Sequence, residues 1–160
     1  MRKLLWSIGG LGVALLALSV AGVRPAGAQT GTPAAPAGTQ DPDKVKRGKY
    51  LTDIVGCSDC HSPLDANNFQ PVEAMRWAGG QAFPLDPASA QVVYSKNMTS
   101  DPETGIGSWS DEQIKLAITQ GIDNTGKRLY PVMPYMTFNN MSDDDLDAIV
   151  AYLRTLPAID

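Results

Sequence analysis

Residues 57–61 read Cys57-Ser58-Asp59-Cys60-His61, and this stretch uses both cysteines and the only histidine of the chain. In a C-x-x-C-H sequence the two thiols lie close enough to add across the two vinyl groups of one haem, and the adjacent imidazole is aimed at the iron. We therefore interpret Cys57 and Cys60 as the attachment site of one covalent haem c, and His61 as a ligand of its iron.

Three other interpretations of this motif remain open. A thioredoxin-like dithiol requires a βαβ surround, and nothing before Cys57 reads as a strand followed by a helix. A closed zinc site needs four nitrogen or sulfur ligands, so carboxylates or a second chain would have to complete it. A structural disulfide can form in an oxidising compartment, but it would leave the sole histidine beside the second cysteine by coincidence. The motif therefore favours haem.

An export signal is predicted over residues 1–28. Arg2 and Lys3 precede an uncharged apolar run over residues 4–23, and Ala26-Gly27-Ala28 supplies the small residues of a cleavage site, so we expect the mature chain to begin at Gln29. An uncleaved membrane anchor is the alternative, because about twenty apolar residues can just span a bilayer. Both interpretations predict a periplasmic location for the folded part, where the cysteines can be loaded with haem.

Composition divides the rest of the chain into a linker and one domain. Residues 29–42 are rich in Pro, Ala and Gly and have little to bury, which is typical of a tether. Residues 43–160 have the size of one small domain and show no internal repeat. Without the signal, ten basic and seventeen acidic residues remain, and the net charge changes from −4 to −7. Such acidity disfavours nucleic acid and anionic membranes as partners.

An amphipathic helix is predicted over residues 43–55, directly before the motif. Its apolar residues recur at approximately helical spacing, Asp41 or Asp43 would cap its start, and Gly56 would end it. A basic patch lies on this helix and has two interpretations, a solvated helix face or a docking rim for an acidic redox partner. The patch consists of Lys44, Lys46, Arg47 and Lys49.

Two further helices are predicted near the end of the chain. A capping box at Ser110 starts the first of them, and Gly121 ends it. Ser142 and the three aspartates after it start the second, which shows an apolar stripe and stops at Pro157. Arg154 in its last turn suits the helix dipole.

Residues 62–109 are dominated by Pro, Gly, Asn and Asp, and we expect loops there. A small chain with so many loops can hardly assemble an apolar core alone. A haem supplies a large flat apolar surface on which such loops can fold. The expected fold is therefore all-α, with three to five helices and long loops around one covalent haem.

Five stretches of the chain together resemble a known family. They are CSDCH at 57–61, Gly79-Gly80, NMTSDPETGIGSWSDEQI at 97–114, LYPVMPY at 129–135 and MSDDDLDAIVAYLRTLP at 141–157. The chain resembles a monohaem class I cytochrome c, and more narrowly the cytochrome c subunits of bacterial periplasmic dehydrogenases for alcohols, aldehydes, sugar acids and N-heterocycles. This resemblance implies an electron carrier rather than an enzyme, with His and Met as iron ligands. The implied partners are a dehydrogenase as donor and an oxidase or another cytochrome as acceptor.

The sixth iron ligand must be Met, Lys, a small molecule or nothing, because no second histidine exists. A thioether is favoured, since soft sulfur suits Fe(II) and a Met/His pair raises the reduction potential. Pro131 and Pro134 bracket Met133 in a rigid loop, and in the resemblance the methionine of MPY is the distal ligand. We therefore predict Met133, with Met136 as its rival. The candidates after the signal are Met75, Met98, Met133, Met136 and Met141.

Two classes of function follow from this site. An electron carrier exchanges one electron with partner proteins through a partly exposed haem edge. A haem enzyme, such as a peroxidase or a thiosulfate-oxidising protein, needs an open sixth site and usually a nearby acid or base. We expect the carrier. Trp109 and Tyr130 can each donate a hydrogen bond to a haem propionate, or pack as aromatic core.

Overall fold

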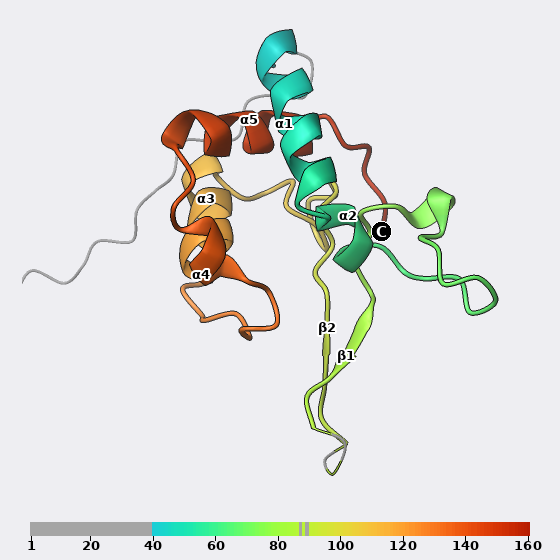
Figure 1. The fold of residues 1–160 in the computed structure, drawn as a ribbon. Coiled ribbons are helices and arrows are strands. Elements are labelled where there is room, and N and C mark those ends of the chain that lie inside the picture. Colours follow the sequence, from blue (N-terminus) through green and yellow to red (C-terminus); the bar gives the residue numbers. More distant parts are fainter. Residues whose placement is uncertain (1–39, 87, 89) are drawn as a thin grey trace, which may run out of the picture.

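The computed structural model describes residues 40–86, 88 and 90–160, and these residues form mostly helices (Figure 1). The elements are α1 (Pro42–Ile54), α2 (Cys57–Cys60), the 3-10 helix η2 (Glu73–Met75), β1 (Ala82–Pro84), β2 (Val92–Tyr94), α3 (Asp111–Gln120), α4 (Tyr135–Phe138) and α5 (Asp143–Leu153). The predicted signal or anchor over 1–28, and the linker as far as residue 39, lie outside the described residues. None of the described helices is long and apolar enough to cross a membrane.

The start of α1 follows from its sequence. The Asp41 side chain accepts hydrogen bonds from two backbone amides of the first turn. Pro42 lies at the first helical position, where a backbone N–H has no partner within the helix, so its missing N–H costs no hydrogen bond. After the helix, Gly56 adopts a φ of 71°, a left-handed conformation that glycine takes without steric cost. The chain can therefore turn sharply and begin α2 at Cys57.

α1 crosses α5 at a glycine. Figure 1 shows the two helices meeting at one end of the molecule, above α2. A Cβ placed on Gly48 would lie 1.8 Å from the carbonyl oxygen of Ala148, so only glycine lets the two backbones approach this closely. This crossing places the C-terminal end of α1, and the cysteine motif after it, against the apolar stripe of α5.

The basic patch on α1 is largely engaged within the fold. Three of its four members form ion pairs: Lys44 with Asp147 (3.5 Å), Arg47 with Asp145 (2.9 Å) and Lys49 with Asp53 (2.7 Å). Two of these pairs join α1 to α5. The helix-face interpretation therefore describes the patch better than the docking-rim interpretation.

The core lies between α1, α3 and α5, and the predicted caps hold the last two helices. The Ser110 hydroxyl accepts from the Gln113 amide at 3.2 Å, and the Gln113 side chain accepts from the Ser110 amide at 2.9 Å. The Ser142 hydroxyl accepts from the Asp145 amide at 3.2 Å. Buried core residues of these helices include Leu51, Ile114, Ile118, Leu146, Ile149, Val150 and Leu153. The all-α expectation is confirmed.

Arg154 has a structural role that the sequence did not reveal. Its side chain is only 5% exposed, and its Nη1 donates to the Ile106 carbonyl at 3.0 Å. Nη2 donates to the Trp109 carbonyl, while Nε and Nη2 both donate to Asp111 Oδ1 at 3.0 and 2.8 Å. The end of α5 is thereby tied to the start of α3 and to the loop before it.

The segment 62–109 is not made of loops alone, because β1 and β2 pair antiparallel there. Ala82 lies opposite Tyr94, and Pro84 opposite Val92. Strands of three residues are too short to show an alternating pattern, and Pro84 argues against a strand when only the sequence is read. The hairpin extends away from the helices (Figure 1), and its half-buried residues Phe83 and Val93 line the candidate site.

Candidate haem site

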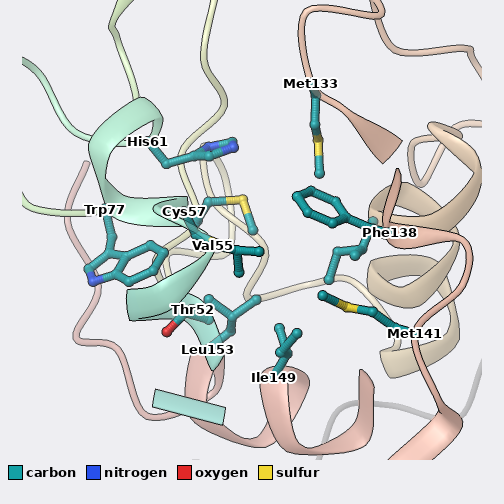
Figure 2. A pocket seen from close by; sticks show the side chains of 12 residues that line it. Thr52, Val55, Cys57, His61, Trp77, Met133, Phe138, Met141, Ile149 and Leu153 are labelled. Carbon is teal, nitrogen blue, oxygen red and sulfur yellow. The ribbon is translucent and has the colours of Figure 1, made fainter. Parts of the chain in front are cut away.

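Two adjoining cavities lie beside α2. The larger has a volume of about 350 Å³, within the ~300–1,000 Å³ typical of small-molecule sites. The cysteine motif, the hairpin and the segment 123–134 line it. The smaller cavity, about 30 Å³, reaches toward the core between α1, α5 and the residues around α4 (Figure 2). Five residues line both cavities, which therefore adjoin at these side chains: Val55, Cys57, His61, Met133 and Phe138.

His61 is oriented by a main-chain group. Its Nδ1 lies 2.7 Å from the backbone carbonyl oxygen of Lys96, and because a carbonyl only accepts, Nδ1 must carry the proton. Burial lowers the pKa of His61, against the opposing influence of this hydrogen bond, and so favours the neutral imidazole. Figure 2 shows the ring projecting into the pocket. A neutral ring with an unprotonated Nε2 is the form in which histidine binds a metal.

The backbone around His61 is fixed by polar groups that the sequence analysis missed. The buried Ser62 hydroxyl donates to the Ser58 carbonyl at 2.6 Å and accepts from the Trp77 amide at 3.0 Å. The Gly79 amide donates to the His61 carbonyl at 2.9 Å. No spacing rule links residues 58–62 to residues 77–79. These bonds hold α2 and the imidazole in place from the following loop.

The two cysteines lie on α2 as free thiols, Cys57 half-buried and Cys60 exposed. Burial, with a smaller influence from Cys60, raises the pKa of Cys57 to about 11, and burial also raises the pKa of Cys60. A redox dithiol relies on a lowered cysteine pKa, so this environment does not suit one. Within the described residues, no group of three or more His, Cys, Asp or Glu side chains could hold a metal ion, so carboxylates of this part of the chain do not complete a zinc site.

The structure separates the candidate methionines. Met133 lines both cavities, whereas Met98 and Met141 line only the smaller one. Met136 lies on α4 with 71% of its surface exposed. In the described part of the chain, neither Met136 nor Met75 lines either of the two cavities. Figure 2 shows Met133 and His61 entering the pocket from different sides, one from the segment before α4 and the other from the end of α2.

The remaining wall suits a large apolar cofactor that bears charged groups at one part of its edge. Val55, Phe83 and Phe138 supply apolar surface. Charged side chains come from only two segments, Lys96 after β2 and the turn that holds Asp123, Lys127 and Arg128. Two thiols, one imidazole and one thioether therefore face an otherwise largely apolar space, and this donor set fits haem c.

Tyr130 and Trp109 differ in their relation to the cavities. Tyr130 lines the larger cavity and is half-exposed, so its hydroxyl is available to a cofactor edge. Trp109 packs against the core instead, and its carbonyl accepts a hydrogen bond from Arg154. The structure thus retains the propionate interpretation for Tyr130 and favours the core interpretation for Trp109.

Comparison with known proteins agrees with this donor set. The sequence model of the family described as Cytochrome c matches residues 45–157. The chain belongs to the cytochrome c family. Its class of cofactor is therefore covalent haem c with iron, so the expected fold and the expected cofactor are confirmed, while the residues assigned to the haem stay predictions. As a cytochrome c, it is an electron-transfer haem protein.

Several curated relatives of this cytochrome c are cytochrome subunits of dehydrogenases. It is 37% identical over 115 residues to the cytochrome c subunit of a quinone alcohol dehydrogenase from Gluconobacter oxydans, covering 71% of this chain and 22% of the relative. It is 38% identical over 110 residues to the gluconate 2-dehydrogenase cytochrome c subunit of Pantoea cypripedii, covering 68% and 22%. The fructose dehydrogenase cytochrome subunit of Gluconobacter japonicus is 33% identical over 111 residues, covering 69% and 21%. The matched region therefore spans about a fifth of the length of each of these relatives.

Proposed function

We propose that this cytochrome c is a periplasmic one-electron carrier, with His61 and Met133 as the axial ligands of its haem iron. One observation carries the proposal: the imidazole of His61 and the thioether of Met133 enter the same pocket, which Cys57 also lines. When bound, the haem supplies a one-electron Fe(III)/Fe(II) couple, and a His/Met ligand pair raises its reduction potential.

Each of these side chains has a distinct task. Cys57 and Cys60 tether the cofactor, so that it remains in the protein in both oxidation states. His61 presents a neutral nitrogen that the Lys96 carbonyl orients. Met133 presents sulfur from a segment that Pro134 ends, since Pro134 is the N-cap of α4. Phe138 lines both cavities and adds apolar surface to the site.

The lining of the smaller cavity supports a carrier over a haem enzyme. A peroxidase-type site needs a general acid or base near the open iron position. Among the described residues that line this cavity, only Cys57 and His61 are titratable, and both are assigned to holding the haem. The rest are apolar side chains and Thr52. A sixth position beside such groups suits a fixed thioether better than an exchangeable substrate.

The proposed partners follow from the relatives and from the charge of the chain. The alcohol and gluconate dehydrogenase relatives are cytochrome c subunits, so we propose a dehydrogenase as electron donor and an oxidase or another cytochrome as acceptor. The periplasmic location rests on the export signal predicted over residues 1–28. A net charge of −4 for the whole chain argues against nucleic acid as a partner.

Substitution of Met133 tests the axial ligand. Met133→Ala should abolish the charge-transfer band of a thioether bound to ferric iron, lower the reduction potential and open the reduced iron to carbon monoxide, because axial ligand identity controls haem chemistry. Met136→Ala is the matched control, since this exposed methionine lies three residues away and lines neither described cavity. It should leave all three observables nearly unchanged.

Two results would contradict the proposal in different ways. The opposite pattern in the two variants would assign the sulfur ligand to Met136 and leave the carrier function standing. Rapid binding of carbon monoxide to the reduced wild-type protein would instead reveal an open sixth position. That result would favour a haem enzyme.

A further inference from the structure

The basic residues of the described part of the chain are unevenly paired. Of the ten lysines and arginines within residues 40–160, six form ion pairs with carboxylates of the described residues. The four that form none in this part of the structure are Lys46, Lys96, Lys127 and Arg128. Three of these four line the larger cavity beside the cysteine motif. In an acidic protein, such a gathering of cations outside ion pairs at one cavity favours the binding of an anion there.

Among the described residues that line this cavity, the one carboxylate is that of Asp123, and it is already engaged by its own turn. Asp123 accepts hydrogen bonds from the Thr125 hydroxyl at 2.7 Å, the Thr125 amide at 2.9 Å and the Lys127 amide at 3.0 Å. Burial raises the pKa of Asp123, but these hydrogen bonds and the charge of Lys96 together outweigh it and leave the pKa below its usual value. Asp123 is therefore ionised, and the three cations with this one anion give the cavity wall a formal charge of +2.

A haem carries an anion of matching charge. Its two propionate groups are carboxylates on the pyrrole rings that do not bear the vinyl groups, so the part of the wall that meets them must differ from the part formed by Cys57 and Cys60. The charged residues of the wall come from residues 96 and 123–128, apart from the cysteine motif in sequence. Carboxylates held against an apolar wall are costly unless they are paired, and no other segment of this wall offers cations.

We propose that Lys127 and Arg128, assisted by Lys96, hold the two propionates of the covalent haem. The guanidinium of Arg128 can bind a carboxylate through two parallel hydrogen bonds, while the lysines act as mobile point charges. The backbone holds this part of the wall in place, because Arg128 lies in a β-bridge with Ile122 and the Leu129 amide donates to the Gly121 carbonyl at 2.7 Å. The hydroxyl of Tyr130, on the same wall, adds a further donor.

An acidic partner protein is the competing occupant of these cations. The haem is favoured because the three side chains line the same cavity as Cys57, Cys60 and His61. The proposal rests on the haem c of the family and not on the identity of the sixth ligand. It can therefore fail while the carrier function stands, and the reverse also holds.

The test compares holoprotein variants that each remove one positive charge. Lys127→Gln and Arg128→Gln should shift the propionate bending band in the resonance Raman spectrum, and each should lower the melting temperature, followed at the Soret band, by several degrees. Arg128→Lys keeps the charge and should restore much of the melting temperature but only part of the band position. Lys46→Gln is the matched control, because Lys46 also forms no ion pair among the described residues but lies on α1, away from the cavity wall. It should change neither property.

Two outcomes would overturn the proposal. If both Gln variants keep the wild-type Raman band and melting temperature but slow electron transfer to an acidic partner, the cations serve protein docking. If the Raman band, the melting temperature and the rate of electron transfer all stay at their wild-type values, these cations hold no anion that stabilises the fold. If Arg128→Gln is not recovered as holoprotein, Lys127→Gln alone decides between these outcomes. A wrong assignment of Met133 would appear instead in the charge-transfer band and in carbon monoxide binding, which the propionate band does not report.

Discussion

Replacing Arg154 with methionine should destabilise the holoprotein strongly, although this residue lies outside the haem pocket. Methionine keeps an unbranched apolar stem of similar reach, so the change removes mainly the guanidinium. The carbonyl of Ile106 then loses a buried donor, and the carbonyl of Trp109 loses one that is partly buried. A buried acceptor left without a partner costs about 1–3 kcal/mol.

The magnitude follows from the exposure of the three partners. We assign the Ile106 carbonyl about 1–3 kcal/mol and the partly buried Trp109 carbonyl about half of that. The Asp111 side chain is 42% exposed and can regain water, so its ion pair adds at most about 1 kcal/mol. The total is about 1.5–5.5 kcal/mol. For a domain of this size, at about 4 °C per kcal/mol, that corresponds to a loss of roughly 6–22 °C in melting temperature.

Guanidinium unfolding of the holoprotein, followed by far-UV circular dichroism and at the Soret band, measures this loss. Arg154→Lys should be intermediate, because the ammonium keeps the charge but cannot reach both carbonyls and Asp111 as a planar fork does. Lys46→Met, on the exposed face of α1, is the surface control and should change the free energy of unfolding by less than about 0.5 kcal/mol. A loss below about 1 kcal/mol for Arg154→Met would show that water replaces the guanidinium at both carbonyls. Wild-type stability in Arg154→Lys would show that the positive charge alone, and not the planar set of guanidinium hydrogen bonds, holds α5 to α3.

Two further predictions concern the crossing of α1 and α5. Gly48→Ala would stabilise an isolated helix by about 1 kcal/mol. Here it should destabilise the protein by about 2–3 kcal/mol or prevent holoprotein formation, because the new methyl group would meet the Ala148 carbonyl. Urea unfolding measures this change in stability, and a stabilised variant would contradict the close approach of the two helices. The hydrogen bond from Lys115, against a smaller opposing influence of burial, lowers the pKa of Asp147, so the stability from this charge is present above the unfolded pKa of about 4 and is lost as the pH falls through the lower folded pKa. Asp147→Asn should therefore flatten the dependence of melting temperature on pH below about pH 5, and an unchanged slope would argue against the ion pair.

The parts of the fold that the sequence predicted are those set by local rules. The caps at Asp41, Ser110 and Ser142 depend on side chains within three residues of the amides that they bind, and a single chain pattern shows them. The haem motif is equally local, because both thiols and the imidazole lie within five residues. The hairpin was missed because three-residue strands leave no period to detect.

The supports of the site could not be predicted because they join distant segments. Ser62 binds the amide of Trp77, fifteen residues later, and Arg154 reaches carbonyls more than forty residues earlier. The residue type does not mark a backbone amide or carbonyl for such a bond, since nearly all residues carry the same two backbone groups. The separation of Met133 from Met136 likewise depended on which of them faces the pocket, which the prolines around them suggested without deciding.

The acceptor that orients His61 is a backbone oxygen of residue 96, and any amino acid at that position would present the same atom. Side-chain substitution therefore cannot probe this bond: scanning mutagenesis could replace Lys96 with each of the other residues, proline aside, and leave the imidazole oriented as before. A comparison of related sequences would not reveal this bond either, because the amino acid at position 96 could vary freely while the hydrogen bond from His61 persists. Chemistry that alters the main chain itself, such as an ester in place of the amide between residues 96 and 97, weakens the carbonyl as an acceptor and reaches this contact directly.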